Sequence, residues 1–215
     1  MTIVIGMKCT DGVVAASDSQ SEFGRGVGVK RLNANKIYCA DSKYLVAGAG
    51  LITHIRALVQ NLFFALQEQR NRQRSELAEE ECEDVIWRTL LAVNRRFNIE
   101  RSGILGVQEP DFFKPLSVFG GKSQMGNQTS FFLFVLHVEG LVESVPDYAT
   151  AGSGAAYAEL LLKNLYWPEI TTAEAAKVAA YVIHEVKHID PNCGGSTNVG
   201  ILTADGIANF EEGRA

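Results

Sequence analysis

Two histidines near the end of the 215-residue chain have the spacing of a zinc site. His184 and His188 stand four positions apart in the segment HEVKH, with Glu185 between them. On a helix both imidazoles would lie on one face, where they can bind Zn²⁺ while the glutamate activates a bound water. A zinc peptidase would need a third ligand, for which Glu211 or Glu212 in the polar C-terminal segment is available.

The helix around this motif favours a simpler interpretation. Polar residues recur along it at steps of three or four, opposite an apolar stripe, which is typical of a helix with one face in water. The polar stripe contains Glu174, Lys177, Tyr181, His184 and His188, and the apolar stripe contains Ala175, Val178, Ala179, Val182 and Val186. Lys187 also puts a charge inside the motif, where zinc peptidases generally carry uncharged residues. We therefore expect a solvated helix face and no metal site.

A second set of reactive groups is expected at the other end of the chain. The β-rich runs TIVIGMKC and VVAASD are joined by the turn residues TDG, so they are predicted to form a hairpin. Such a hairpin pairs residue i with a residue numbered roughly 21 to 23 minus i, whichever short turn is used. This register places Asp18 within a few residues of Thr2.

A second hairpin is predicted to bring a lysine to a glycine. Its strands are KIYCA and KYLVAGAG, and its turn lies near Asp41 and Ser42. By the same register argument, Lys36 lies opposite Ala47, Gly48 or a near neighbour. A threonine, an aspartate, a lysine and a glycine are therefore expected at strand ends.

These groups fit nucleophilic catalysis by an N-terminal threonine. A small residue after Met1 lets cellular aminopeptidases remove the methionine, so the mature chain is expected to begin at Thr2. The hydroxyl of a terminal threonine is a nucleophile, and its α-amino group, whose ordinary pKa is about 7.7 to 8.0, can accept the hydroxyl proton. A nearby Lys36 ammonium would lower the pKa of that amine, and Asp18 would keep the lysine charged and in place.

Composition argues against several other classes of function. The net charge is −5 and the isoelectric point is near 5.4, which argues against nucleic acid partners because phosphate binding needs a basic surface. No apolar run reaches the roughly 18 residues that span a bilayer, and the N-terminus lacks a charged-then-apolar leader, so no membrane association is expected. Four widely spaced cysteines without a C-x-x-C pair indicate a reducing compartment, and we expect a cytoplasmic protein.

The remaining elements alternate between strand runs and helix pairs. The expected order is four strands with a polar loop at 19–28, helices from residue 51 and over 75–97, and the strands LSVFGG, FFLFVLHV and LVESV. Ser153 is predicted to cap a third helix, Thr171 and Glu174 form the capping box of a fourth, and NVGILTA and IANF follow as strands. This pattern favours one layered α+β domain over residues 1–215, since βαβ repeats need a crossover between successive strands.

Several segments resemble the β subunits of proteasomes. They are TIVIGMKCTDGVVAASDS, NKI, VAGAG, AGSG and IDPNCGGSTNVGILT, and they follow the family's order over nearly the whole chain. The resemblance implies the N-terminal nucleophile hydrolase fold, a four-layer αββα sandwich of two antiparallel sheets flanked by helix pairs. The Met-Thr start is similar to the proteolytic subunit of the bacterial two-component ATP-dependent protease, whereas the GGS after Asp190 looks more like proteasome subunits proper.

The resemblance also implies roles for individual residues. It makes Thr2 the nucleophile and base, Asp18 and Lys36 the charge pair that tunes it, and the Gly48 N–H the oxyanion hole. Ser153 and Asp190 match residues that support the terminal amine. Substrate contacts are implied for Ser21, Glu22, Val46, Gly48 and Gly50. Glu22 stands where the family commonly has a threonine, and Cys193 stands where it has a second supporting serine.

The leading hypothesis is a threonine endopeptidase that needs no cofactor. The resemblance implies a homo-oligomeric ring of six or seven chains, stacked in two, to which an AAA+ ATPase or another activator feeds unfolded polypeptide. The alternatives are a non-catalytic scaffold subunit of the same fold, an N-terminal nucleophile amidase or transpeptidase, and the zinc metallopeptidase considered above.

Overall fold

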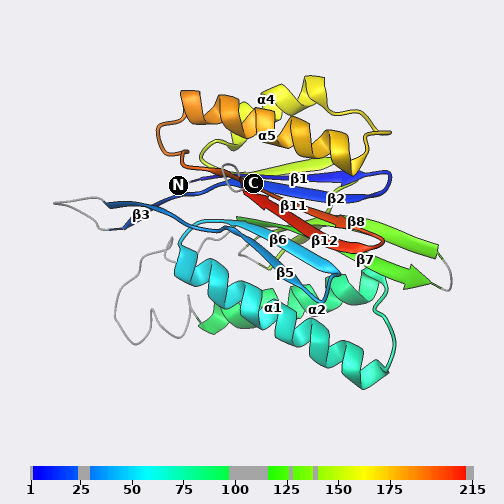
Figure 1. Cartoon of the computed structure of the whole chain (residues 1–215). Helices are drawn as coiled ribbons and strands as arrows, with labels where there is room; N and C mark the ends of the chain where they lie inside the picture. Colours follow the sequence, from blue (N-terminus) through cyan, green and yellow to red (C-terminus); the bar gives the residue numbers. More distant parts are fainter. Residues whose placement is uncertain (1, 24–29, 97–115, 126–127, 138–139, 212–215) are drawn as a thin grey trace.

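The computed structural model describes residues 2–23, 30–96, 116–125, 128–137 and 140–211. Within these ranges two antiparallel five-stranded sheets face each other, and a pair of helices covers the outer side of each (Figure 1). The prediction of an α+β fold, a four-layer αββα sandwich of two sheets between helix pairs, is confirmed.

The first sheet holds the predicted N-terminal hairpin at its centre. Its strand order is β10-β1-β2-β11-β12. The bounds are β1 (Ile3–Cys9), β2 (Gly12–Asp18), β10 (Tyr148–Gly152), β11 (Thr197–Thr203) and β12 (Gly206–Glu211). Val4 pairs with Ser17 and Cys9 with Gly12, which is the predicted register. Nearly every residue of β1 and β2 is buried because a helix layer covers one face and the other sheet covers the opposite face.

The second sheet contains the predicted second hairpin. Its strand order is β5-β6-β7-β8-β9. The bounds are β5 (Ile37–Ala40), β6 (Tyr44–Ala49), β7 (Leu116–Met125), β8 (Gln128–Leu136) and β9 (Val142–Ser144). The turn between β5 and β6 has Asp41 and Ser42 at φ 55° and 52°. They are the central residues of a turn that the N–H of Lys43 closes by donating to the Ala40 carbonyl oxygen at 3.0 Å, so the predicted turn is confirmed.

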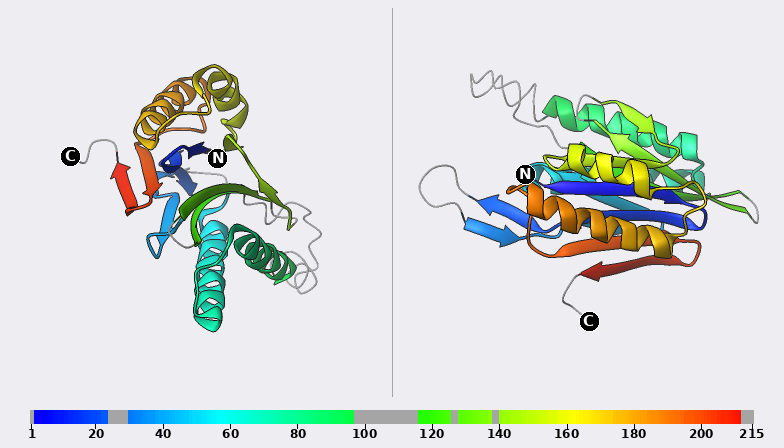
Figure 2. Two further views of the ribbon diagram at one scale, coloured as in Figure 1. Left: turned by 90° about the vertical axis from the view of Figure 1, so that its right-hand side faces the viewer. Right: turned by 90° about the horizontal axis from the view of Figure 1, so that it is seen from above.

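The helices form the two outer layers (Figure 2). Their bounds are α1 (Ile52–Gln73) and α2 (Glu79–Asn94) on the second sheet, and α4 (Ala155–Leu165) and α5 (Thr172–Ile189) on the first. The capping box of Thr171 and Glu174 is present at the start of α5, as predicted. The helix predicted over 75–97 is α2, which begins later, and residue 97 lies outside the described ranges. In the described part of the chain, no helix is both long and apolar enough to cross a membrane.

The buried side chains fall into three layers that match this architecture. One layer lies between α1–α2 and the second sheet, around Leu58, Phe119 and Phe132. A second lies between α4–α5 and the first sheet, around Ile5 and Val182. The third fills the space between the sheets and includes Val4, Val13, Leu45, Val118 and Leu133. Both hairpins are therefore held in place from two sides.

Three local predictions are wrong. In the polar segment predicted as a loop at 19–28, residues 20–23 form β3 (Gln20–Phe23), which pairs antiparallel with β4 (Lys30–Asn33) and extends beyond the sheets (Figure 1), whereas residues 24–28 lie outside the described ranges. The two four-residue strands contain only Phe23 and Leu32 as apolar residues, so the residue pattern does not indicate them. Strand β10 was not predicted because, apart from Tyr148, its residues are small and form no apolar run. The cap residue of α4 is Gly154, and the Ser153 side chain makes no capping bond.

Candidate functional site

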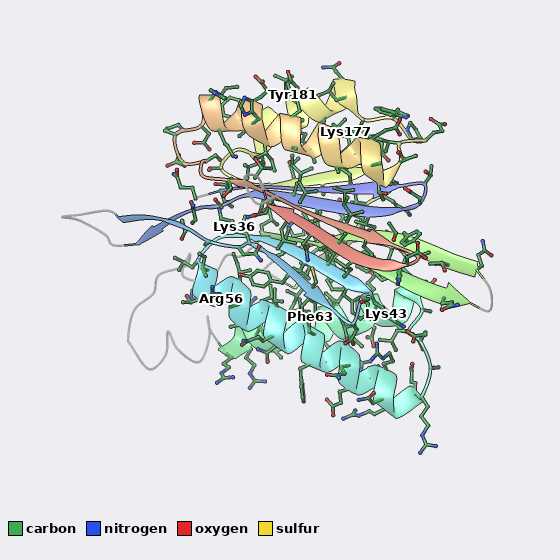
Figure 3. All side chains as sticks on the ribbon, viewed as in Figure 1. Lys36, Lys43, Arg56, Phe63, Lys177 and Tyr181 are labelled. Atoms are coloured by element: carbon green, nitrogen blue, oxygen red, sulfur yellow. The ribbon has the colours of Figure 1, made fainter. Side chains whose placement is uncertain are left out.

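The side chains of Asp18 and Lys36 meet that of Thr2, and all three residues lie at strand ends. Thr2 precedes β1, and Asp18 is the last residue of β2. Lys36, which is labelled in Figure 3, precedes β5 in the opposite sheet. The Thr2 hydroxyl contacts both the Asp18 carboxylate and the Lys36 ammonium. Lys36 Nζ lies 2.6 Å from Asp18 Oδ1. All three residues are buried, with 2%, 0% and 4% of Thr2, Asp18 and Lys36 exposed. The proximity of Thr2 and Asp18 predicted from the first hairpin is therefore present, and the packing of the two sheets brings Lys36 to both residues.

Backbone donors fix the Asp18 carboxylate. Its Oδ1 accepts a hydrogen bond from the N–H of Ile3 at 3.1 Å. Its Oδ2 accepts from the N–H of Gln20 at 3.2 Å and from that of Gly194 at 3.0 Å. These bonds, with the Lys36 ammonium, compensate for taking the carboxylate out of water. The carboxylate is thereby held in one position beneath Thr2.

The charge state of Lys36 reflects two opposing effects. Burial lowers the pKa of its ammonium, while the Asp18 carboxylate and its hydrogen bond raise it, and the net result is a pKa below the ordinary 10.5. The ammonium therefore loses its proton more readily than a lysine in water. A cation so close to Thr2 also favours a nearby amine in its neutral, proton-accepting form.

A second group approaches Thr2 from the helix layer. Ser153 Oγ donates to the Thr2 carbonyl oxygen at 3.4 Å, and the N–H of Gly154 donates to the same oxygen at 3.3 Å. Asp190 follows directly after α5, where it is the C-terminal cap residue. Cys193 Sγ lies 3.9 Å from Ser153 Oγ and donates to Asp190 Oδ2 at 3.4 Å. Ser153 thus touches both Thr2 and the Cys193 thiol.

The two ionisable groups of this second cluster are shifted in opposite directions. Burial would raise the pKa of the Asp190 carboxyl, but hydrogen bonds from Asn192, Ser153 and Cys193 outweigh it and lower the pKa below 3.8. Burial raises the pKa of the Cys193 thiol to about 12, and the charges of Asp18 and Asp190 add to that effect. Near neutral pH the cluster therefore contains a carboxylate and an uncharged thiol.

The predicted oxyanion donor has a partner in this structure. The N–H of Gly48 donates to the carbonyl oxygen of Lys36 at 3.1 Å, as expected for residues that face each other across the hairpin. A Cβ at Gly48 would lie 2.5 Å from Ile55 Cγ2, so only glycine fits against α1. An oxyanion at this N–H would have to share the hydrogen with the Lys36 carbonyl.

The other residues with predicted substrate contacts lie in two places, next to Gly48 and in strand β3. Val46 is fully buried in the layer under α1. Gly50 is exposed and has φ 131°, a conformation that favours glycine. In the β3–β4 hairpin, Ser21 pairs with Leu32 and Glu22 with Arg31. A role in substrate binding stays a prediction for these residues.

Sequence reasoning missed the backbone groups that complete the site. The N–H groups of Gly194, Gln20 and Gly154 carry no residue-type signal, because every residue except proline has one. Gly152 has φ 103°, and a Cβ there would lie 2.1 Å from the Thr2 carbonyl oxygen, but a glycine in the sequence does not indicate which segment it approaches. The glycines of AGSG and CGG therefore mark places where the chain passes close to Thr2 and Asp18.

The HEVKH segment forms the last turns of α5, just before Asp190. His184 and His188 are exposed on α5, on the side opposite its apolar stripe, as predicted. Across the described ranges, no group of three or more His, Cys, Asp or Glu side chains is placed to hold a metal ion.

The sequence was compared with known protein families and proteins. A family profile described as "Proteasome subunit" matches residues 2–98 and 120–202. The chain belongs to the proteasome subunit family. The matched ranges include both hairpins and both groups of residues around Thr2.

Individual relatives agree with the family assignment. The protein "Proteasome subunit beta" of Methanosphaera stadtmanae is 28% identical over 96% of this chain and 88% of its own length. The "Proteasome subunit beta" of Nanoarchaeum equitans is 27% identical over 96% of this chain and 95% of its own length. "Proteasome subunit beta 2" of Pyrococcus furiosus is 28% identical over 97% of this chain and 90% of its own length. The resemblance to proteasome β subunits is therefore confirmed, and the chain is a proteasome-type subunit.

Proposed function

We propose that this proteasome-type subunit is a threonine endopeptidase whose nucleophile is the Thr2 hydroxyl. The observation that carries the proposal is the contact of this hydroxyl with both members of the buried Asp18–Lys36 ion pair. Burying two charges costs free energy unless they stabilise each other or another group. The contact of a buried ion pair with the Thr2 hydroxyl therefore supports a chemical role for this hydroxyl. The names of the relatives support the same assignment.

The proposed active form begins at Thr2. While Met1 is attached, the Thr2 nitrogen is an amide and cannot accept a proton. After cleavage between Met1 and Thr2 it is an amine, which takes the hydroxyl proton as Oγ1 attacks the carbonyl carbon of the substrate. The amine then returns this proton to the leaving nitrogen as the peptide bond breaks. Water then attacks the ester carbon while the amine takes a proton from it, and the amine returns this proton to Oγ1 as the ester bond breaks. The proposed chemistry therefore uses water and groups of the chain, and needs no cofactor.

Neighbouring residues are proposed to assist these steps. The Lys36 ammonium keeps the terminal amine neutral, and Asp18 holds the lysine in place. Ser153 and Asp190 position the terminal residue through its backbone. The Gly48 N–H would stabilise the negative oxygen of the tetrahedral intermediate by sharing its hydrogen with the Lys36 carbonyl, an interaction commonly worth about 3 kcal/mol in such sites.

The proposal includes an assembly. An exposed endopeptidase would attack folded partners indiscriminately, so we propose a homo-oligomeric ring of six or seven chains, stacked in two, in the cytoplasm. An AAA+ ATPase or another activator would supply unfolded polypeptide. The word "subunit" in the names of the relatives supports an oligomer.

Replacement of Thr2 tests the proposal. Thr2→Ala should abolish both the hydrolysis of unfolded polypeptide and covalent labelling by an epoxyketone, because it removes the nucleophile while leaving the amine. Thr2→Ser should retain labelling. Thr10→Ala, at the exposed β1–β2 turn, is the matched control and should keep full activity. Undiminished hydrolysis by Thr2→Ala would show that the nucleophile lies elsewhere.

A non-catalytic subunit of the same fold is the second candidate. It is favoured by the Gly48 N–H, which already donates to Lys36. Intact mass spectrometry separates the two candidates, since a catalytic chain must be lighter by Met1 and a scaffold need not be. A purified chain that retains Met1 and takes up no epoxyketone would support the scaffold.

A further inference from the structure

The two histidines of HEVKH are arranged as a pair on the outer face of α5. Their ring centroids lie 4.6 Å apart with an interplanar angle of 64°. Both residues are exposed. Figure 3 labels Tyr181 and Lys177 on the same helix, about one and two turns before His184, and these residues are also exposed. The imidazoles are therefore adjacent and reachable from solvent.

A backbone hydrogen bond determines which nitrogen of His188 is available. Its Nδ1 lies 2.8 Å from the carbonyl oxygen of His184. A carbonyl oxygen can only accept, so Nδ1 must carry the hydrogen. In the neutral ring this leaves Nε2 with a free lone pair. Metal-binding histidines are usually oriented in this way, with the other ring nitrogen donating to a backbone carbonyl or a carboxylate.

The charge inside the motif is turned away from the pair. Lys187 Nζ donates to Thr197 Oγ1 on β11 at 2.7 Å. Its ammonium is therefore held toward the first sheet, not beside the imidazoles. This placement removes the objection that a cation within HEVKH raises against metal binding.

We propose that His184 and His188 form a two-imidazole site for a divalent transition-metal ion such as Zn²⁺, Ni²⁺ or Cu²⁺. Imidazole nitrogen suits these ions, with bonds of about 2.0–2.1 Å for zinc. Rings whose centroids are 4.6 Å apart can direct one nitrogen each to a single ion of this size. Water fills the remaining coordination positions, because the described residues supply no third ligand.

The site has no part in peptide hydrolysis. It lies on the exposed face of α5, whereas Thr2 is buried directly before the start of β1. The inference therefore stands independently of the proposed threonine chemistry, and the two can fail separately.

Calorimetric titration of the purified, untagged protein with NiCl₂ tests the site. One Ni²⁺ per chain is expected. His184→Gln and His188→Gln should each weaken binding about a hundredfold, because two linked ligands gain about that much over one. His137→Gln is the matched control, since His137 pairs with Glu143 at 3.3 Å in the second sheet and should not affect binding. Wild-type protein that binds no Ni²⁺, or variants that bind it as tightly as the wild type, would overturn the proposal.

Nuclear magnetic resonance of the same protein locates the bonds. Long-range ¹H–¹⁵N spectra should show His188 as the Nδ1–H tautomer, and addition of Zn²⁺ should shift the Nε2 resonance of His188. A shift confined to other histidines would contradict the site. Peptide hydrolysis by His184→Gln should equal that of the wild type, with or without Zn²⁺.

Discussion

Lys36 and Asp18 form an ion pair from which water is almost wholly excluded. Replacing such a pair with apolar groups is often nearly neutral, whereas removing one partner leaves an uncompensated charge. The pair is satisfied here because the carboxylate accepts from three backbone N–H groups, those of Ile3, Gln20 and Gly194. These hydrogen bonds offset the cost of burying the pair and fix both charges against the Thr2 hydroxyl.

Asp18→Asn is expected to lower the free energy of unfolding by about 3–5 kcal/mol, since it leaves the Lys36 ammonium buried without its counter-ion. The double variant Asp18→Asn/Lys36→Met should lose less than the sum of the two single variants, because no charge is then left unpaired. Urea denaturation of the four proteins measures this coupling. Strictly additive losses would show that the pair does not interact in the native state.

Cys193 should make stability depend on pH in the alkaline range. The native thiol has a pKa near 12, against an ordinary value of 9.0 for the unfolded chain. Between these values the native state keeps a proton that the unfolded state has lost, so the free energy of unfolding falls as pH rises above 9.0. Below that pH both states are protonated and the contribution of Cys193 is constant.

Denaturation midpoints of wild type and Cys193→Ser, measured across this range, test the effect. The serine variant should lose less stability between neutral pH and pH 10–11, because its hydroxyl does not ionise there. Parallel pH profiles for the two proteins would contradict the shifted thiol.

At the scale of elements, α5 is fastened to the β1–β2 hairpin at both ends. At its start, the Asp11 carboxylate accepts from the N–H of Thr172 at 2.7 Å and from its hydroxyl at 3.0 Å. After its end, the N–H of Gly194 donates to Asp18. The helix thereby places Asp190 and Cys193 next to the strand end that carries Thr2. Its own beginning depends on the capping box of Thr171 and Glu174.

Thr171→Ala is expected to lower the free energy of unfolding by about 1 kcal/mol, since it removes the side chain that caps the N–H of Glu174. Thr171→Ser keeps the hydroxyl and should lose much less. Thermal or urea denaturation measures both variants. Equal losses in the two would assign the effect to packing of the threonine methyl group.

At the scale of the whole molecule, the active-site candidates depend on how closely the two sheets approach. Lys36 comes from the second sheet and Thr2 and Asp18 from the first. Glycines permit the approach: a Cβ on Gly6 would lie 2.1 Å from Val118 Cγ1, across the space between the sheets. The Val118 side chain packs directly on the Gly6 backbone. A single methyl group added at Gly6 must therefore displace the valine or move the two sheets apart.

Gly6→Ala is expected to cost about 1–3 kcal/mol of stability through overpacking. Val118→Ala removes the obstructing methyl groups, so the double variant Gly6→Ala/Val118→Ala should be more stable than the sum of the single losses predicts. Urea denaturation of the set provides the coupling energy. No coupling between positions 6 and 118 would mean that the sheets separate elsewhere to accept the methyl group.

The sequence by itself determined the elements whose signals are local. Turn residues and β-rich runs set both hairpin registers, and hence the positions of Asp18 and Lys36, because side-chain period and turn length leave few alternatives. The helical period and the capping box located α1 and α5. Segments of family resemblance identified the order of layers and the residues around Thr2.

Only the tertiary structure decided what depends on backbone groups from distant segments. The β3–β4 hairpin and β10 form through main-chain hydrogen bonds that no residue pattern marks. Ser153 donates to the Thr2 carbonyl and does not cap α4, and the N–H of Gly48 is taken by Lys36. Every residue but proline carries the same donor and acceptor, so their partners follow from how the sheets and helices pack.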